Sequence, residues 1–242
     1  MCLFDLFTSK KKLIDAGILQ GSTDWHSHIL PGVDDGIPKM EDALAVLKYY
    51  EEVGIHDVWL TPHIMEDVPN TTDDLRARFA ELKEAYNGPV QLHLAAENMI
   101  DNLFGERFAK NDLLPIGPNG DHLLVETSYF QPPIDFYRTL KQIKEAGYQP
   151  ILAHPERYRY MDDADYDRLI SMKVKLQLNL MSLVGGYGKP VQIKAQSLLQ
   201  KGYYTFYGSD LHRLGIYKEA INYKGLKADL AVKLRAINNM IQ

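Results

Sequence analysis

The segment Gly147-Tyr148-Gln149-Pro150-Ile151-Leu152-Ala153-His154-Pro155-Glu156-Arg157 contains one complete unit of the fold that we expect. Its glycine follows the helical pattern over residues 134–146, at the position where a left-handed helix terminator is common. A short apolar run begins a few residues later and closes on histidine and charged residues. The segment therefore predicts the end of a helix, a short loop and a strand with a polar carboxyl end.

The same unit recurs along the whole chain. Helical patterns cover residues 40–53, 73–86, 134–146, 165–172 and 191–201, and three of them stop at Gly54, Gly147 and Gly202. Strand-like runs cover residues 23–28, 57–63, 90–97, 122–127, 150–154, 175–180 and 203–210. Alternation of short apolar runs with helical patterns is typical of βα units in a parallel sheet. We therefore expect an α/β fold, a distorted seven-stranded (β/α) barrel related to the TIM barrel.

An open doubly wound sheet is the alternative fold. It is less favoured because no glycine-rich phosphate loop follows the first strand-like run. The 242 residues are enough for one domain with a sizeable core, because 45% of them are hydrophobic. A net charge of −5 argues against a nucleic-acid partner held by a broad basic surface.

The N-terminal residues and the single cysteine limit the location and the chemistry. Cys2 is the only cysteine, so an intramolecular disulfide and a cysteine-rich zinc site are both excluded. No apolar run approaches the roughly 20 residues of a membrane helix. Asp5 and the lysines of residues 10–12 make residues 1–20 unlike a signal peptide, so we expect a cytoplasmic protein. Peripheral contact of Phe4, Leu6 and Phe7 with an anionic membrane is the alternative.

Potential metal ligands close six of the seven strand-like runs. These residues are His26, His28, His63, Glu97, Glu126, His154, Asp210 and His212. The carboxyl ends of barrel strands meet at the functional mouth, so we expect these side chains to converge there. Residues at i and i+2 of a strand point the same way, so His26 and His28 can approach one ion together. Imidazoles mixed with carboxylates suit manganese, iron or zinc better than calcium.

The other three histidines have a different position in the runs. His56, His93 and His122 lie at the beginnings or in the middle of strand-like runs, and we interpret them as structural. A lone histidine is more often a satisfied polar residue than a ligand. The prediction of a metal centre therefore depends on the coincidence of ligands at equivalent strand ends, and not on any one residue.

Three motifs resemble the polymerase and histidinol phosphatase (PHP) superfamily. They are Asp24-Trp25-His26-Ser27-His28-Ile29-Leu30-Pro31-Gly32-Val33-Asp34-Asp35-Gly36, Ala153-His154-Pro155-Glu156-Arg157-Tyr158 and Ser209-Asp210-Leu211-His212. More narrowly, the chain resembles the bacterial manganese-dependent protein-tyrosine phosphatases encoded with capsule and exopolysaccharide genes. The Val-Asp-Asp-Gly and His-Pro-Glu-Arg-Tyr elements separate this branch from the histidinol phosphatases. The resemblance implies a single PHP-type domain over residues 22–242, after an N-terminal extension of residues 1–21.

The resemblance also implies a ligand set for three divalent metal ions. Manganese is favoured, with iron or zinc as alternatives. In this scheme, one ion is held by His26, His28, Glu97 and Asp210. Glu97 bridges to a second ion, whose site is completed by Glu126 and His154. The third ion is held by Asp35, His63 and His212. Asp34 is the local rival of Asp35, and spacing alone does not choose between them.

The implied centre predicts a phosphatase. Three divalent ions and four carboxylates would leave a net charge of about +2, which attracts a phosphoryl dianion. We expect a metal-bound hydroxide to attack phosphorus in line. Arg157 is the candidate catalytic and phosphate-binding residue, because a guanidinium can bind two phosphate oxygens at once. A surface salt bridge between Arg157 and Glu156 is the alternative role, and Arg213 is a second substrate-binding candidate.

By resemblance, the substrate is a phosphotyrosine protein, the tyrosine-rich tail of a bacterial tyrosine kinase that controls polysaccharide export. A small-molecule phosphatase of the histidinol-phosphate type is the alternative. A barrel that only stores metal or binds a partner is a third possibility, since it would need the ligands but not Arg157.

Overall fold

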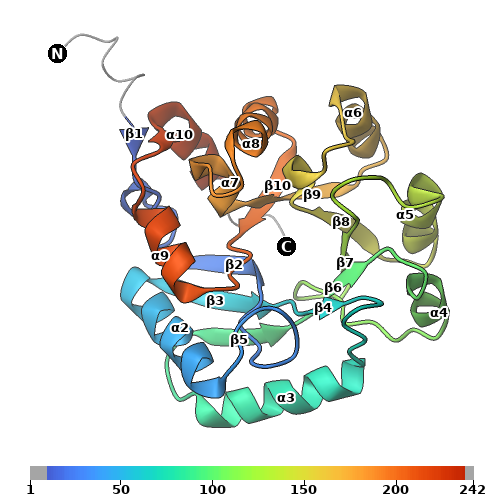
Figure 1. Cartoon of the computed structure of the whole chain (residues 1–242), viewed down its shortest axis with the longest axis horizontal. Coiled ribbons are helices and arrows are strands. Elements are labelled where there is room, and N and C mark those ends of the chain that lie inside the picture. The colour runs from blue at the N-terminus through green and yellow to red at the C-terminus, as the bar shows by residue number, and fades with distance from the viewer. Residues whose placement is uncertain (1–9, 238–242) are drawn as a thin grey trace.

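All seven strand-like runs form strands in the computed structural model, which describes residues 10–237. The strands are β2 (Ser22–Ser27), β3 (Ile55–Leu60) followed by β4 (His63–Ile64), β5 (Gln91–Leu94) followed by β6 (Glu97–Met99), β7 (His122–Glu126), β8 (Gln149–Ala153), β9 (Lys175–Asn179) and β10 (Tyr204–Gly208). Helices surround them on the outside (Figure 1).

The strands form two parallel sheets. One has six strands in the order β10-β9-β8-β7-β6-β4, and the other has three in the order β2-β3-β5. Every strand pair in both sheets is parallel, which confirms the predicted α/β class. We expected a distorted seven-stranded barrel, but residues 10–237 do not form one closed barrel, because the hydrogen-bond ladder is interrupted at two seams.

The first seam divides the second and third predicted strands. Pro62 has no backbone N–H, so the run over residues 57–63 separates into β3 and β4. The neighbouring run separates at the same level, into β5 and β6. Two isolated backbone hydrogen bonds join the two runs at this seam. Ala95 N donates to Leu60 O at 2.9 Å, and Glu97 N donates to Pro62 O at 3.1 Å.

The second seam lies between β10 and β2. Asp210 N donates to His26 O at 2.8 Å, and His28 N donates to Leu211 O at 3.0 Å. Asp210 has a φ of +50°, in the left-handed region, so the backbone turns sharply where β10 ends. The two strands therefore approach each other without a regular ladder, and both seams lie where the predicted ligands are.

The expected helices are present. α2 (Met40–Val53) buries Ala43, Val46, Leu47 and Tyr50 on one face and ends at Gly54, whose φ is +81°. In α3 (Thr72–Ala85), the side chain of Thr71 accepts from Asp74 N and caps the helix. The others are α5 (Phe136–Glu145), α6 (Asp163–Ser171) and α8 (Lys189–Lys201).

Sequence patterns missed the shorter elements and those near the chain ends. These are α4 (Phe104–Ala109), α7 (Leu180–Val184), α9 (Leu214–Asn222), α10 (Ala228–Ala236), the 3-10 helices η1 (Ile14–Ala16) and η2 (Pro155–Arg157), and the short strands β1 (Lys10–Lys11) and β11 (Leu226–Lys227). Helices of five or six residues are too short to display an amphipathic period.

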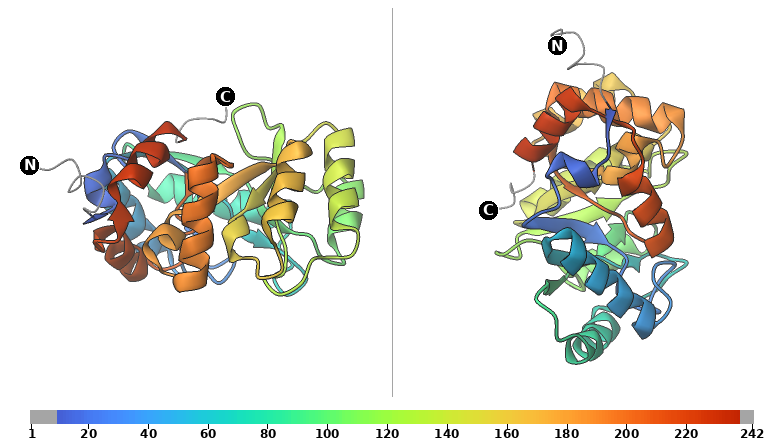
Figure 2. Two further views of the ribbon diagram at one scale, coloured as in Figure 1. Left: turned by 90° about the horizontal axis from the view of Figure 1, so that it is seen from above. Right: turned by 90° about the vertical axis from the view of Figure 1, so that its left-hand side faces the viewer.

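The N-terminal residues that the structure describes pack onto the domain. β1 pairs antiparallel with β11, and Leu13, Ala16 and Leu19 are buried in the main core. Two further views show these two ends of the described chain on the same side of the molecule (Figure 2). Phe4, Leu6 and Phe7, for which membrane contact was considered, lie outside the described residues. No helix within residues 10–237 has the length and apolar character needed to cross a bilayer.

Candidate metal centre

The nine predicted ligands lie together, near the carboxyl ends of β2, β7, β8 and β10 and at the first residues of β4 and β6. They come from β2 and the loop after it, from β4, β6 and β7, and from the residues that follow β8 and β10. Their ligand atoms form four groups, each within 4.8 Å: His28, Asp35, His63 and His212; His26, His28 and Asp210; His26, Glu97 and His154; and His63, Glu97 and Glu126. All nine are buried or half-buried except Asp35, whose side chain is 72% exposed.

Glu97 lies at the middle of the cluster. Its Oε2 lies 3.2 Å from His26 Nε2 and 3.1 Å from His63 Nδ1, and its Oε1 lies 3.0 Å from His154 Nε2. Burial raises the pKa of Glu97, but His26 and His63 outweigh burial and hold that pKa well below its usual range. The carboxylate is therefore ionised and faces several imidazoles, as a bridging ligand would.

The donor atoms fit a cation better than they fit each other. Within the described residues, both Glu97 oxygens, Glu126 Oε1 and His63 Nδ1 are buried without a hydrogen bond of acceptable geometry. The Nε2 atoms of His26 and His28 lie only 3.1 Å apart. Because the Nδ1 atoms of both rings face acceptor oxygens, the Nε2 atoms present lone pairs to the same space when the rings are neutral. Such a set of facing acceptors is the arrangement that a divalent metal satisfies.

The structure separates Asp34 from Asp35. Asp34 Oδ2 accepts from His28 Nδ1 at 2.8 Å and from His63 N at 3.0 Å, and its Oδ1 accepts from Gly36 N. Asp35 Oδ1 instead lies 3.3 Å from His212 Nε2 and 3.6 Å from His63 Nε2. A hydrogen bond with His212 is the main reason that the pKa of Asp35 is lowered to about 2. Asp35 therefore faces the cluster, whereas Asp34 orients a neighbouring histidine.

Outer hydrogen bonds orient the rings of His26 and His212 and hold the backbone of His154. His26 Nδ1 donates to Gln177 Oε1 at 3.1 Å, and the same oxygen accepts from His154 N at 3.0 Å. His212 Nδ1 donates to Asp210 O at 3.0 Å. Bonds of this kind fix the tautomer and direct the other ring nitrogen towards a metal. Sequence reasoning did not single out Gln177, although a polar residue inside the apolar run 175–180 was a usable signal.

The metal-free site holds protons that a metal would displace. Burial and His28 both lower the pKa of His63, but Glu97 and Glu126 raise it to about 9. Burial lowers the pKa of His26, and Glu97 and Asp210 raise it above its usual value. The histidines are thus partly charged when no cation balances the carboxylates.

Arg157 lies beside the cluster between two aromatic rings. Its Nη1 donates to Asp210 Oδ2 at 2.7 Å, and its guanidinium carbon lies 4.4 Å and 4.2 Å from the ring centroids of Tyr129 and Tyr187. Burial lowers the pKa of Arg157, but Asp210 outweighs it and raises that pKa. The alternative salt bridge with Glu156 is not formed, because Glu156 is buried and accepts from Asn179 N and Tyr204 OH.

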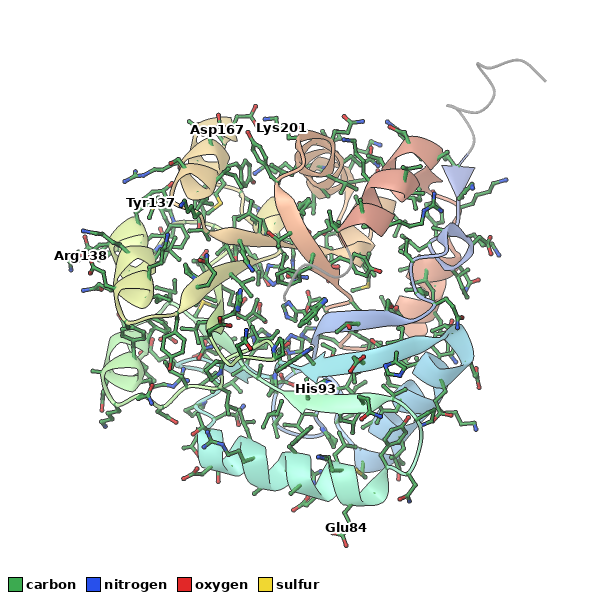
Figure 3. All side chains as sticks on the ribbon, turned by 180° about the vertical axis from the view of Figure 1, so that it is seen from behind. Glu84, His93, Tyr137, Arg138, Asp167 and Lys201 are labelled. Carbon is green, nitrogen blue, oxygen red and sulfur yellow. The ribbon has the colours of Figure 1, made fainter. Side chains whose placement is uncertain are left out.

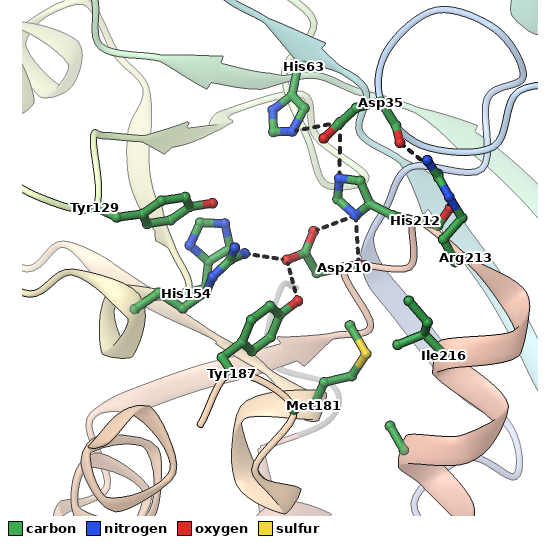
Figure 4. Close-up of a pocket in the computed structure, with 13 residues that line it drawn as sticks. Asp35, His63, Tyr129, His154, Met181, Tyr187, Asp210, His212, Arg213 and Ile216 are labelled. Carbon is green, nitrogen blue, oxygen red and sulfur yellow. Dashed lines mark hydrogen bonds and ion pairs between the residues drawn. The ribbon is translucent and has the colours of Figure 1, made fainter. Parts of the chain in front are cut away.

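Arg213 lies near the same site but is bound to backbone. Its Nη1 donates to the carbonyl oxygens of Asp35 and Gly36, so it fastens the loop that carries Asp35. Gly36 is required in this loop, since a Cβ there would clash with His28 O. Figure 4 shows Arg213 beside Asp35, on the far side of His212 from Asp210.

A cavity of about 500 Å³ opens over the cluster. Ligand residues line one side, and Met181, Tyr187 and Ile216 line another (Figure 4). The cavity therefore joins a wall of potential metal ligands to an apolar wall, which suits a phosphate ester with an apolar leaving group.

The remaining histidines lie outside the four groups. His56 Nδ1 and His93 Nε2 both contact Asp57, at 2.8 Å and 2.9 Å, and His122 Nε2 lies 2.7 Å from Lys175 Nζ. Figure 3 labels His93 on the three-stranded sheet. Each has a local polar partner, as the structural interpretation requires.

Comparisons with known proteins agree on one family. The family model described as capsular polysaccharide synthesis, CpsB/CapC, matches residues 22–222. The putative tyrosine-protein phosphatase CapC of Staphylococcus aureus is 26% identical over 215 residues, which cover 85% of this chain and 84% of that protein. The tyrosine-protein phosphatase YwqE of Bacillus subtilis is 27% identical over 198 residues, with 79% and 77% covered.

Solved structures show the same similarity in fold. One comes from the work on YwqE of Bacillus subtilis and CpsB of Streptococcus pneumoniae, described as unique metal-dependent tyrosine phosphatases. It has a TM-score of 0.75 at 24% identity and covers 88% of this chain and 85% of its own. The phosphotriesterase homology protein of Escherichia coli, with phosphate in its active site, has a TM-score of 0.50 at 13% identity, with 85% and 87% covered.

Proposed function

This chain belongs to the CpsB/CapC family of capsular polysaccharide synthesis, and we propose that it is a metal-dependent protein-tyrosine phosphatase. The resemblance to the capsular phosphatases that the sequence motifs indicated is confirmed by the family match. The observation that carries the proposal is the convergence of nine His, Asp and Glu side chains on one cavity with Arg157 beside them.

The ligand assignment is part of the proposal. Three divalent ions, manganese by preference, would be held by His26, His28, Asp35, His63, Glu97, Glu126, His154, Asp210 and His212. The four overlapping groups of ligand atoms support more than one ion, and the position of Glu97 in two of them supports a bridging role. When bound, the ions would supply Lewis-acid activation of water and of phosphoryl oxygens.

Arg157 would bind the phosphoryl group. A guanidinium has five donors, so Arg157 can keep its bond to Asp210 while other N–H groups meet phosphate oxygens in the cavity. The rings of Tyr129 and Tyr187 limit its movement, which keeps the fork in one orientation. Arg213 would hold the Asp35 loop and, from the wall of the cavity, would also contact the substrate.

A tyrosine leaving group matches the rest of the cavity. The tyrosine hydroxyl has a pKa of about 10, so tyrosinate needs less help from a general acid to leave than an alkoxide does. Met181 and Ile216 offer an apolar wall to the phenyl ring. The substrate would be a phosphotyrosine protein, and we propose the tail of a bacterial tyrosine kinase that regulates capsular or exopolysaccharide synthesis. We place this enzyme in the cytoplasm, with a phosphatase domain over residues 22–242 and residues 1–21 as an extension.

The test compares two substrates before and after metal removal. Purified protein should contain a transition metal, hydrolyse a phosphotyrosine peptide much faster than histidinol phosphate, and lose both activities after chelation. Manganese should restore them. Faster turnover of histidinol phosphate would instead favour the small-molecule phosphatase, and full metal occupancy without turnover would favour a non-catalytic role.

Two substitutions separate the metal scheme from other chemistries. Arg157→Lys should lower kcat/KM by about a hundredfold with unchanged metal content, because the planar fork is lost and the charge is kept. Cys2→Ser should leave turnover intact, since the metal scheme uses no thiol. A large loss in Cys2→Ser, or an unaffected Arg157→Lys enzyme, would contradict the mechanism.

A further inference from the structure

The two ends of the described chain form one structural unit outside the family match. The match covers residues 22–222, whereas β1 and β11 lie before and after it and pair with each other. Arg235 Nη1 on α10 donates to Ala16 O at 2.9 Å, and Leu13 and Leu230 are both buried in the main core. We call residues 10–21 and 223–237 the terminal ribbon.

The terminal ribbon is strongly basic on an acidic protein. It contains seven basic residues and two acidic ones, a net charge of +5, while the whole chain has −5. The basic residues are Lys10, Lys11, Lys12, Lys224, Lys227, Lys233 and Arg235, and the acidic residues are Asp15 and Asp229. Charge segregation of this size is a feature of surfaces that bind a charged partner.

Repulsion within one pair of lysines destabilises the free protein. Lys10 lies directly opposite Lys227 in the antiparallel register, and both side chains are exposed. Residues paired in this way project from the same face of the ribbon, and like charges there repel. Within residues 10–237 neither lysine forms an ion pair, whereas exposed lysines elsewhere, such as Lys110 with Glu106, do. An external anion would remove this repulsion.

Apolar side chains accompany the lysines. Tyr223, which follows α9, is 56% exposed, and Val232 on α10 is 60% exposed. The sequence just before the ribbon also contains Leu3, Phe4, Leu6 and Phe7, whose placement is outside the described residues. Basic residues interspersed with apolar ones are typical of segments that bind an anionic lipid surface, where both the charge and the apolar groups contribute.

We propose that the terminal ribbon docks this protein on an anionic membrane surface. The contact is peripheral: the lysines face acidic headgroups, and Tyr223 and Val232 reach the interface. The proposal does not depend on the phosphatase activity, because the ribbon shares no residue with the metal centre. Each Lys or Arg held at an anionic surface strengthens binding roughly fivefold, so the ribbon can localise the enzyme without a spanning helix.

Lys227→Glu is the informative variant. It replaces the Lys10–Lys227 repulsion by an attractive cross-strand pair, so the melting temperature should stay equal or rise. It also changes the charge of the ribbon by two units, so binding to vesicles of phosphatidylcholine with phosphatidylglycerol should fall about thirtyfold. Lys48→Glu on α2 is the matched control, because Lys48 is exposed, lies away from the ribbon in sequence and undergoes the same charge change.

Vesicle co-sedimentation of the full-length protein measures the effect. The wild-type protein and the Lys48→Glu variant should bind the anionic vesicles and dissociate from them at high salt. Neither protein should bind vesicles of phosphatidylcholine alone. Hydrolysis of a small phosphate ester should be equal in all three proteins, which shows that the fold is intact. Equal binding by Lys227→Glu and Lys48→Glu would overturn the proposal, as would retention on polyglutamate without any binding to vesicles.

Discussion

Gln177→Leu tests whether hydrogen bonds outside the ligand set hold the centre together. Gln177 is fully buried on β9, and its Oε1 accepts from His26 Nδ1 and from His154 N. Leucine has a similar size and no polar atoms, so the substitution leaves packing nearly unchanged and removes both bonds, together with the bond that Gln177 Nε2 donates to Leu178 O. His26 then loses the partner that fixes its tautomer, and the backbone N–H of His154 is left buried without an acceptor.

Two magnitudes follow from these contacts. Loss of an outer-shell partner typically weakens metal binding by 10–100-fold, so we expect about this loss for the ion nearest His26 and His154. An unsatisfied buried N–H costs about 1–3 kcal/mol, so the free energy of unfolding of the metal-free protein should fall by about this amount. Metal titration of chelator-treated protein measures the first effect, and urea unfolding measures the second.

Gln149→Leu is the matched control. Gln149 begins β8 at the opposite end of the strands, and its Nε2 donates to backbone carbonyls. Its substitution should affect stability and leave metal affinity unchanged. If Gln177→Leu loses stability but binds metal as tightly as the wild-type protein, the hydrogen bonds to His26 and His154 do not orient these ligands and the reasoning fails.

Two further predictions concern Arg157 and His63. Tyr187→Ala should raise the inhibition constant for inorganic phosphate about fivefold, because it removes one of the two rings that contact the Arg157 guanidinium. Tyr187→Phe keeps the ring and should resemble the wild-type enzyme. Equal effects of the two substitutions would show that the hydroxyl group matters instead of the ring. The metal-free protein should lose stability as pH rises from about 6.5 to about 9, because the pKa of His63 is raised on folding and the stabilising proton is lost across that interval. The loss from His63 is at most about 3 kcal/mol. Thermal unfolding of chelated His63→Ala is the control, and its slope should be smaller but not absent, because the pKa of His26 is also raised on folding.

Local sequence patterns were sufficient for the strands around the site, although they missed the short helices η2 and α7 beside it. An apolar run followed by a polar end is visible in consecutive residues, so all seven strands were predicted within a few residues. Gly54, Gly147 and Gly202 marked helix ends because only glycine adopts their positive φ values without cost. The strand ends also indicated the cluster of potential ligands, since parallel βα units place all carboxyl ends at one face.

The tertiary structure decided which of these parts meet and how. Pro62 could be read in the sequence, but the division of the strands into two sheets depends on the pairing of several distant segments. Asp34 and Asp35 are adjacent and chemically identical, and only the path of their loop directs one to His28 and the other to His212. The Lys10–Lys227 pair joins residues near opposite ends of the chain.

The sequence by itself determined the βα alternation, the strand ends and the kinds of side chain available there, because these depend on neighbouring residues. Only the folded chain determined the ligand groups, the enclosure of Arg157 by Tyr129 and Tyr187, and the basic terminal ribbon. The physical reason is range: periodicity and turn chemistry act over a few residues, whereas a metal site or a cross-strand repulsion depends on distances between atoms that the sequence separates widely.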